Sequence, residues 1–291
     1  MRVNVLGAGT MGSGVAQLAA MNGHHVTCYD PGIGSLDRGR RAVEQSLARF
    51  VRSEKLTPAE SHTISEHVRF TGDLDDAADG AEVIVESVIE DLETKRSVID
   101  QAAALALPDC LLGTNTSQLS ITAIGAGLSA DRSTRLIGMH FFNPPVLMRL
   151  VELTRGQLTD DETTERARAF AATLNREVVL LNKDMPGFIT TRISGIIRLE
   201  CLRILEEGVA SAEDIDRACT LGLNLPMGPL ALGDFNGLDT YLKAMDTLAD
   251  SLGERFRPPQ VLRNMVMAGF TGRKSGKGFY RYDEDGQRVD A

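Results

Sequence analysis

The sequence of 291 residues lacks any apolar run near the about 18 consecutive residues that a membrane-spanning helix needs. Its first apolar segment, Met1 to Leu6, is too short for a secretory signal and is broken at once by Gly7. Apolar residues still make up 43% of the chain, enough to build a buried core. We therefore expect a protein without membrane contact, whose chain begins directly in folded structure without processing.

Cysteine is scarce, and positive charge is in deficit. The four cysteines are widely separated and form no C-x-x-C pair, so we expect buried, reduced thiols in a cytoplasmic protein, and no metal site. The formal net charge is −9, and an acidic chain does not attract a nucleic-acid backbone over its whole surface. We therefore expect no nucleic-acid partner.

One stretch runs against the acidic balance. Residues 36–55 hold six basic side chains against three acidic ones. This stretch is either an ordinary solvated helix face or a local site for an anionic ligand. Charge alone leaves both interpretations open.

Apolar runs and helical periodicities alternate along the first two thirds of the chain. Short apolar runs are typical of buried strands, and apolar residues at helical spacing are typical of helices packed on a sheet. Their alternation predicts an α/β fold with a largely parallel, doubly wound, Rossmann-like sheet. The expected strands are residues 3–6, 26–29, 82–87, 111–114, 136–140, 150–153 and 178–181, and the expected helices are residues 11–22, 36–52, 92–105 and 162–175.

The pattern changes at residues 183–187, Lys-Asp-Met-Pro-Gly. From there to Gly269 apolar residues recur at helical spacing, and no run is typical of a strand. The sequence contains no repeats, low-complexity stretches or long linkers. It therefore predicts a first domain of residues 1–185 and a second, all-helical domain of residues 186–291.

A glycine-rich turn lies between the first expected strand and the first expected helix. Residues 7–12 fit G-x-G-x-x-G, whose glycines allow a tight turn and a close approach of the backbone to a pyrophosphate. Asp30 ends the next strand, where a carboxylate accepts hydrogen bonds from the adenosine ribose and repels a 2′-phosphate. We therefore expect NAD rather than NADP, with a glycine turn of some other α/β fold as the alternative. The expected contacts are Gly7, Gly9, Thr10, Met11, Gly12 and Asp30.

Among the five histidines, His140 ends an expected strand. Ligands of open α/β sheets bind beyond the carboxyl ends of strands, and histidine suits proton transfer near neutral pH. Glu152 lies on what we expect to be the neighbouring strand, where its carboxylate would fix the tautomer of the ring and favour the imidazolium. The alternatives are a structural histidine and an exposed acid on an edge strand.

The segment Thr114-Asn115-Thr116-Ser117 follows another expected strand at the same end of the sheet. Ser117 is placed to exchange a hydrogen bond with the reacting oxygen, and Asn115 is placed beside the cofactor. The alternative for Ser117 is a helix N-cap, for which Ser120 is better placed.

The chain contains, in order, GAGTMGSGVA, VIVESVIEDLETK, TNTSQLSIT, IGMHFFNPPVLMRLVEL, PGFI, LEEGVASAEDID, PMGPLALGD and GRKSGKGFY. Together these segments resemble the 3-hydroxyacyl-CoA dehydrogenase family, the 3-hydroxybutyryl-CoA type in particular. The resemblance covers nearly the whole chain, and HFFNP and TNTS are not generic Rossmann patterns. It implies the NAD-dependent oxidation of an (S)-3-hydroxyacyl thioester to the 3-ketoacyl thioester, or the reverse, with a short acyl chain on coenzyme A.

The resemblance also implies roles for individual residues. His140 is then the base, Glu152 its orienting acid, and Ser117 and Asn143 are contacts of the substrate and the nicotinamide. The second domain would carry part of the substrate site and the contact of a homodimer. The resemblance places Glu90, Lys95 and Lys274 beside NAD and Ser46 on the coenzyme A side, to which we add Arg52 and Lys55.

One position departs from the family pattern. Thr191 stands where the family carries an asparagine after Pro-Gly-Phe-Ile. A threonine hydroxyl cannot offer the paired donor and acceptor of an amide, so we expect Thr191 to affect which acyl group is accepted. Three alternatives stay open: a dehydrogenase of a carrier-protein-bound hydroxyacyl unit such as glyceryl, a sugar-acid or carnitine dehydrogenase, and a non-enzymatic relative such as a crystallin. The intact His140, Glu152 and Ser117 disfavour the last.

Overall fold

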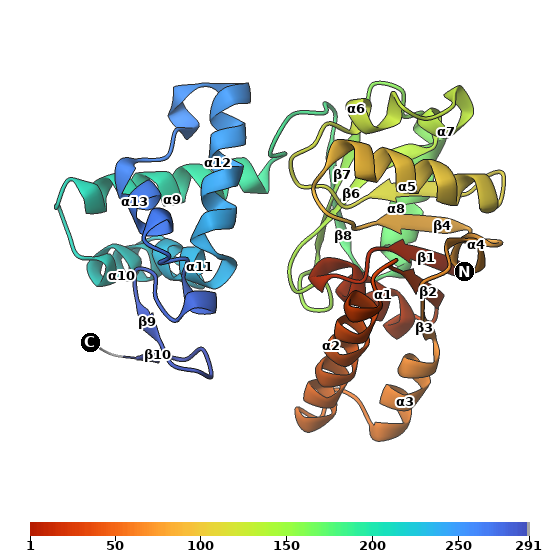
Figure 1. Ribbon diagram of the computed structural model, residues 1–291, viewed down its shortest axis with the longest axis horizontal. Coiled ribbons are helices and arrows are strands. Elements are labelled where there is room, and N and C mark those ends of the chain that lie inside the picture. Colours follow the sequence, from red (N-terminus) through yellow and green to blue (C-terminus); the bar gives the residue numbers. More distant parts are fainter. Residues whose placement is uncertain (290–291) are drawn as a thin grey trace. The chain divides into compact units, whose positions relative to one another are not determined.

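The computed structural model describes residues 1–289 and divides into two compact units (Figure 1). The first unit runs from Met1 to Met185, and the second begins at Pro186. Each unit encloses its own buried apolar core. Among the helices of residues 1–289, none is both long and apolar enough to cross a bilayer.

An eight-stranded sheet forms the centre of the first unit. Its strand order is β3-β2-β1-β4-β5-β6-β7-β8, and every neighbouring pair is parallel except β6 and β7. The chain order reverses between β1 and β4, and ligands of such sheets bind beyond the carboxyl ends of the strands at that reversal. The strands are β1 (Arg2–Leu6), β2 (His25–Tyr29), β3 (Val68–Thr71), β4 (Val83–Glu86), β5 (Leu111–Thr114), β6 (Leu136–Phe141), β7 (Leu150–Arg155) and β8 (Glu177–Leu181).

Helices connect the consecutive strands of the first unit, except β6 and β7, which a loop joins. Asp91, Ser120 and Asp160 each begin a helix by accepting a hydrogen bond from the backbone N–H three residues further on. The longest helix, α2, buries Val43 and Leu47 and leaves its basic side chains exposed. The helices are α1 (Thr10–Met21), α2 (Ile33–Arg52), α3 (Pro58–Glu66), α4 (Leu74–Ala78), α5 (Leu92–Leu105), α6 (Ile121–Gly125), α7 (Ala130–Thr134) and α8 (Asp161–Thr173).

The predicted α/β fold with a largely parallel, doubly wound sheet is confirmed. All the strands and helices expected in this part of the chain are present, within a few residues of their predicted bounds. The sequence pattern did not reveal β3, because this edge strand has only four residues and none of them is fully buried. The short helices α4, α6 and α7 have five residues each, too few to show a periodicity.

The second unit is built from helices. Its elements are α9 (Thr190–Glu206), α10 (Ala212–Gly222), α11 (Pro229–Asn236), α12 (Leu238–Leu252), the 3-10 helix η1 (Glu254–Phe256), α13 (Gln260–Met267), the 3-10 helix η2 (Arg273–Ser275), β9 (Arg281–Tyr282) and β10 (Arg288–Val289). The helical expectation is confirmed from α9 to α13. The antiparallel pair of β9 and β10 corrects the all-helical prediction, because two strands of two residues each are too short to show in the sequence.

Two buried carboxylates join the segments of the second unit. Asp234, which is inaccessible to solvent, accepts hydrogen bonds from the backbone N–H groups of Phe279 and Tyr280. Burial raises the pKa of the Asp234 carboxyl. Asp216 accepts from the backbone N–H of Leu230 at 2.9 Å and from the Tyr280 hydroxyl at 2.7 Å. Since these carboxylates satisfy buried backbone donors, the segments PMGPLALGD and GKGFY contribute to the fold of this unit.

Candidate active site

The glycine-rich turn joins β1 to α1 at the carboxyl edge of the sheet. Gly7 has a φ of +101°, and a Cβ there would lie 2.7 Å from the carbonyl oxygen of Ser87. A Cβ at Gly12 would lie 1.8 Å from the carbonyl oxygen of Gly7, so only glycine fits. A Cβ at Gly9, by contrast, would meet no atom within 4 Å. The turn is thus tightly packed behind and open at Gly9, which fits the close approach of a pyrophosphate to the amino end of α1.

Asp30 directly follows β2 and holds this turn. Its Oδ2 accepts a hydrogen bond from the backbone N–H of Ala8 at 3.0 Å, and its Oδ1 accepts one from that of Gly32 at 2.9 Å. The carboxylate therefore stands between the glycine turn and the start of α2, and part of it stays exposed. This position fits the adenosine ribose of a dinucleotide whose pyrophosphate lies at Gly9.

A cluster of three charged side chains lies at the end of β4: Glu86 and Lys95 are buried, and the side chain of Glu90 is 34% exposed. Lys95 Nζ lies 2.8 Å from Glu86 Oε1 and 3.2 Å from Glu90 Oε2. Lys95 is only 1% exposed, so its ammonium group lies in the interior of the first unit, and its expected place beside NAD stays a prediction. Glu90 in turn accepts hydrogen bonds from the backbone N–H of Ser117 and from the Thr116 hydroxyl. Lys95 therefore supports the segment that carries Ser117.

Glu86 is the residue of this cluster that the sequence analysis missed. It is inaccessible to solvent and accepts from Lys95 Nζ, from Thr114 Oγ1 at 2.6 Å and from the backbone N–H of Val88 at 2.7 Å. Burial raises the pKa of Glu86. Burial also opposes ionisation of Glu90, but the charge of Lys95 and the hydrogen bonds outweigh it and lower the pKa of Glu90. The only sequence signal for Glu86 was an acidic residue inside an apolar strand.

His140 and Glu152 face each other across the antiparallel pair of β6 and β7. They are direct partners in the register, and His140 Nδ1 lies 2.8 Å from Glu152 Oε2. Glu152 is inaccessible to solvent and His140 is 9% exposed. The Phe142 ring lies against the imidazole, with 4.5 Å between the ring centroids. Because Nδ1 is directed to the carboxylate, Nε2 lies on the opposite edge of the ring.

The other histidines are placed differently. His24 Nε2 lies 3.0 Å from the Thr173 hydroxyl, and burial lowers the pKa of His24. The rings of His25 and His67 lie 4.7 Å apart, at the amino ends of β2 and β3. His62 is exposed beside Glu66. None of these four lies at the carboxyl end of a strand, where His140 lies.

Ser117 and Asn143 lie in loops that follow β5 and β6. Ser117 is half-buried, and Ser120 instead caps α6, as the sequence predicted. Asn143 is exposed and precedes a cis peptide bond to Pro144. The next residue, Pro145, is held through its carbonyl oxygen by Arg176 at 2.9 Å. Ser117 and Asn143 thus follow the carboxyl ends of β5 and β6, at the edge of the sheet where His140 lies.

The residues expected on the coenzyme A side lie on and after α2. Ser46 is 9% exposed, on the same buried face as Val43 and Leu47. The expected place of Ser46 on the coenzyme A side stays a prediction. Arg52 and Lys55 are exposed, and Lys55 Nζ lies 5.9 Å from the centre of the Phe50 ring.

Two expected residues lie in the second unit. Thr191 is half-buried in the first turn of α9. Lys274 lies in η2, and its Nζ is paired with Asp239 at 2.7 Å. Their contacts with substrate and NAD stay predictions.

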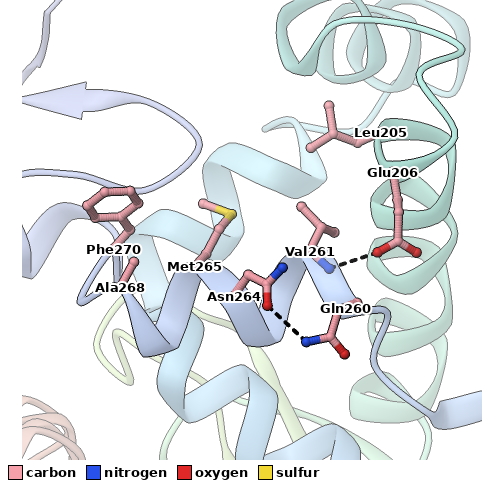
Figure 2. A pocket seen from close by; sticks show the side chains of 8 residues that line it. All are labelled: Leu205, Glu206, Gln260, Val261, Asn264, Met265, Ala268 and Phe270. Carbon is pink, nitrogen blue, oxygen red and sulfur yellow. Dashed lines mark hydrogen bonds between the residues drawn. The ribbon is translucent and has the colours of Figure 1, made fainter.

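A pocket of about 610 Å³ lies between α9 and α13 in the second unit, and Figure 2 shows the side chains that line it. Leu205, Val261, Met265 and Phe270 give it an apolar wall. Glu206 is the one titratable residue that lines it, and its carboxylate accepts a hydrogen bond from the backbone N–H of Val261 at 2.8 Å. This cavity therefore contains no group arranged for proton transfer like His140 and Glu152.

The sequence matches two family models, described as the NAD binding domain of 3-hydroxyacyl-CoA dehydrogenase over residues 2–185 and its C-terminal domain over residues 187–282. It is 42% identical to a probable 3-hydroxybutyryl-CoA dehydrogenase of Deinococcus radiodurans, over 97% of this chain and 100% of that relative. A 3-hydroxybutyryl-CoA dehydrogenase of Bradyrhizobium diazoefficiens is 39% identical, over 97% of this chain and 95% of that relative.

Solved structures agree with these matches. The crystal structure of FadB2 from M. tuberculosis superposes with a TM-score of 0.93 at 37% identity, over 97% of this chain and 99% of that one. The (S)-3-hydroxybutyryl-CoA dehydrogenase PaaH1 from Ralstonia eutropha superposes with a TM-score of 0.90 at 37% identity, with the same coverage. The chain therefore belongs to the 3-hydroxyacyl-CoA dehydrogenase family of NAD-dependent oxidoreductases.

Proposed function

We propose that the protein oxidises the 3-hydroxyl group of a short-chain (S)-3-hydroxyacyl thioester with NAD, or catalyses the reverse reduction. The observation that carries this proposal is the pair of His140 and Glu152, 2.8 Å apart at the carboxyl edge of the same sheet as the glycine turn. The names of the relatives from Deinococcus radiodurans and Ralstonia eutropha support 3-hydroxybutyryl-CoA as the substrate.

In this mechanism NAD, when bound, accepts the hydride from the carbon that carries the hydroxyl group. His140 accepts the hydroxyl proton at Nε2 and becomes an imidazolium. The Glu152 carboxylate accepts a hydrogen bond from the Nδ1–H of His140. It stabilises the positive charge on the ring, because both groups are buried. Ser117 and Asn143 orient the substrate oxygen and the nicotinamide. In the reverse direction His140 returns the proton to the 3-keto oxygen.

We expect NAD to be preferred over NADP by at least about tenfold in kcat/KM, equivalent to about 1.4 kcal/mol. Asp30 would place its carboxylate against the extra phosphate of NADP. Asp30→Ser should narrow the preference. The matched control is Asp37→Ser, which removes an acid from the exposed pair with Arg40 on α2 and should leave the preference unchanged. Equal use of both cofactors by the wild type would contradict this role.

We propose that Arg52 and Lys55 bind the phosphates of coenzyme A, as two exposed cations at the end of α2. Changing both to alanine should raise KM for the coenzyme A thioester about 3- to 10-fold, the range for two exposed charge contacts. KM for an N-acetylcysteamine thioester, which has no phosphate, should not change. Added salt should weaken the wild-type preference for coenzyme A.

The control for this variant is Arg166→Ala combined with Arg168→Ala on α8, which removes the same charge elsewhere. An unchanged KM for the coenzyme A thioester in the Arg52 and Lys55 variant would contradict this role. The basic side chains of α2 would then form an ordinary solvated helix face. A carrier protein offers the same phosphopantetheine arm as coenzyme A. If the variant raised KM only for carrier-protein substrates, the carrier protein and not coenzyme A would be the group that these two residues bind.

The substrate also has an acyl group, whose identity is a separate proposal from that of the phosphate-bearing carrier. We propose 3-hydroxybutyryl, with Thr191 leaving a single hydroxyl in the first turn of α9 where the family carries an amide. A panel of 3-hydroxyacyl substrates, free, on coenzyme A and on carrier protein, tests this through the absorbance of NADH. Rapid turnover of 3-hydroxybutyryl-CoA supports the proposal. Turnover restricted to a glyceryl carrier protein, a sugar acid or carnitine contradicts it.

We further propose that the protein is a homodimer that associates through residues 186–291. An apolar groove on α9 supports this, because exposed apolar surface of this kind marks protein contacts. The groove has a volume of about 770 Å³, and Ile193, which lines it, is 58% exposed. Sedimentation equilibrium should give twice the chain mass of 31.5 kDa. A monomer at micromolar concentration would contradict the dimer.

We propose a cytoplasmic location. The support is that Cys28, Cys110, Cys201 and Cys219 are all buried and unbridged, as in proteins of reducing compartments. Fractionation of the source cells tests this, and recovery of the protein outside the cytoplasm would contradict it.

A further inference from the structure

The pairing between β5 and β6 stops before the end of β6. The last register pair of these parallel strands is Thr114 with Gly138. β5 ends there, whereas β6 continues through His140 to Phe141. On its other side β6 stays paired with β7 as far as Phe141. In the described part of the chain, strand pairing therefore holds the segment of His140 on the β7 side alone.

The side chain of Asn115 takes the place of the missing strand. Its Oδ1 accepts a hydrogen bond from the backbone N–H of Phe141 at 2.8 Å. Its Nδ2 donates to Ser87 Oγ at 3.3 Å, and its backbone N–H donates to the carbonyl oxygen of Glu86 at 2.7 Å. Asn115 is thus attached to the end of β4 and bonded to the end of β6, directly beside His140.

We propose that Asn115 is a positioning residue that fixes the backbone next to His140, and through it the place of the imidazole. An amide suits this task, because it offers an acceptor and a donor in one plane. Both polar ends of the side chain make hydrogen bonds within the protein, and the cofactor contact expected from the sequence stays a separate prediction. The proposal rests on the proposed function, in which His140 is the base.

Asn115→Ala should lower kcat by about 10- to 100-fold, because a small displacement of a catalytic group is costly in rate. The dissociation constant of NADH, measured by fluorescence titration, should change by less than about threefold. The matched control is Asn4→Ala. Asn4 is 1% exposed and joins β1 to β2 through a bond from Nδ2 to the carbonyl oxygen of Thr27 at 3.1 Å. Its loss should lower the melting temperature and leave kcat unchanged.

A double-mutant cycle separates positioning from general damage. In the His140→Ala background, Asn115→Ala should reduce kcat by less than about threefold further, because its effect acts through the imidazole. Asn115→Asp keeps an acceptor for the Phe141 N–H and should retain most of the wild-type kcat, which covers the case in which the alanine variant does not fold. Hydrogen exchange at the Phe141 amide should be faster in Asn115→Ala than in the wild type.

Three results would overturn the positioning role: an unchanged kcat in Asn115→Ala, a rise in the NADH dissociation constant that accounts for the loss, or the full loss recurring on top of His140→Ala. Hydrogen exchange at Phe141 needs no substrate. A wild type without dehydrogenase activity but with the expected exchange result therefore counts against the proposed function, whereas an active wild type with unchanged exchange and kcat counts against Asn115.

Discussion

His140→Ala should lower kcat by about 10²- to 10⁴-fold, the usual contribution of a positioned general base. The dissociation constant of NADH should stay close to that of the wild type, because the glycine turn and Asp30 do not involve this histidine. Steady-state kinetics and a fluorescence titration of NADH measure the two quantities. A loss of NADH affinity equal to the loss of turnover would contradict the role of base.

The control for this variant is His24→Gln. His24 is also buried, at 5% exposed. Its contacts are Thr173 and Phe170, and neither of them belongs to the proposed catalytic residues. Its replacement should affect the melting temperature and leave kcat of the folded enzyme unchanged. If both histidine variants lose turnover equally, the effect reflects damage to the fold rather than loss of the base.

Glu152→Gln should lower kcat by about 10-fold or more while the shape of the site is kept. The glutamine cannot carry the negative charge that stabilises the imidazolium, and Glu152 is inaccessible to solvent, so water does not replace that charge. The acid limb of the pH–rate profile should move to lower pH, because protonation of the ring becomes less favourable in the variant. The measurement is kcat/KM across the pH range in which the wild type is active.

Glu177→Gln is the matched control for Glu152. Glu177 begins the neighbouring strand β8 and is exposed, paired with Arg149 at 3.2 Å. Exposed pairs of this kind contribute little to stability, so this variant should keep the wild-type profile. A Glu152→Gln enzyme whose profile and kcat match those of Glu177→Gln would show that the pair of His140 and Glu152 is structural.

The candidate site follows from the sequence where local signals and topology agree. The glycine turn is local, and its position after an apolar run predicted a strand, a turn and a helix that the structure contains. The placement of His140 and Glu152 on neighbouring strands could be predicted, because consecutive strands are often neighbours in a sheet.

Other features depend on packing that no local pattern records. Lys95 occurs on a polar-looking helix, yet the fold buries it between Glu86 and Glu90. Ser46 lies in a basic stretch of the sequence, yet it is on the buried face of α2. The hydrogen bond from Phe141 to Asn115 depends on β5 ending before β6, and residue spacing does not show relative strand lengths. Tertiary contacts decided each of these three positions.

The central claim is that this chain transfers a hydride between NAD and the 3-hydroxyl carbon of a thioester, with His140 as the base. The most direct measurement is the initial rate of NADH formation from (S)-3-hydroxybutyryl-CoA and NAD, with the wild type and His140→Ala compared at equal folded concentration. The account predicts rapid formation of NADH by the wild type and a rate lower by about 10²-fold or more in the variant. A wild type that binds NAD but forms no NADH from this substrate, or a variant as fast as the wild type, would contradict it.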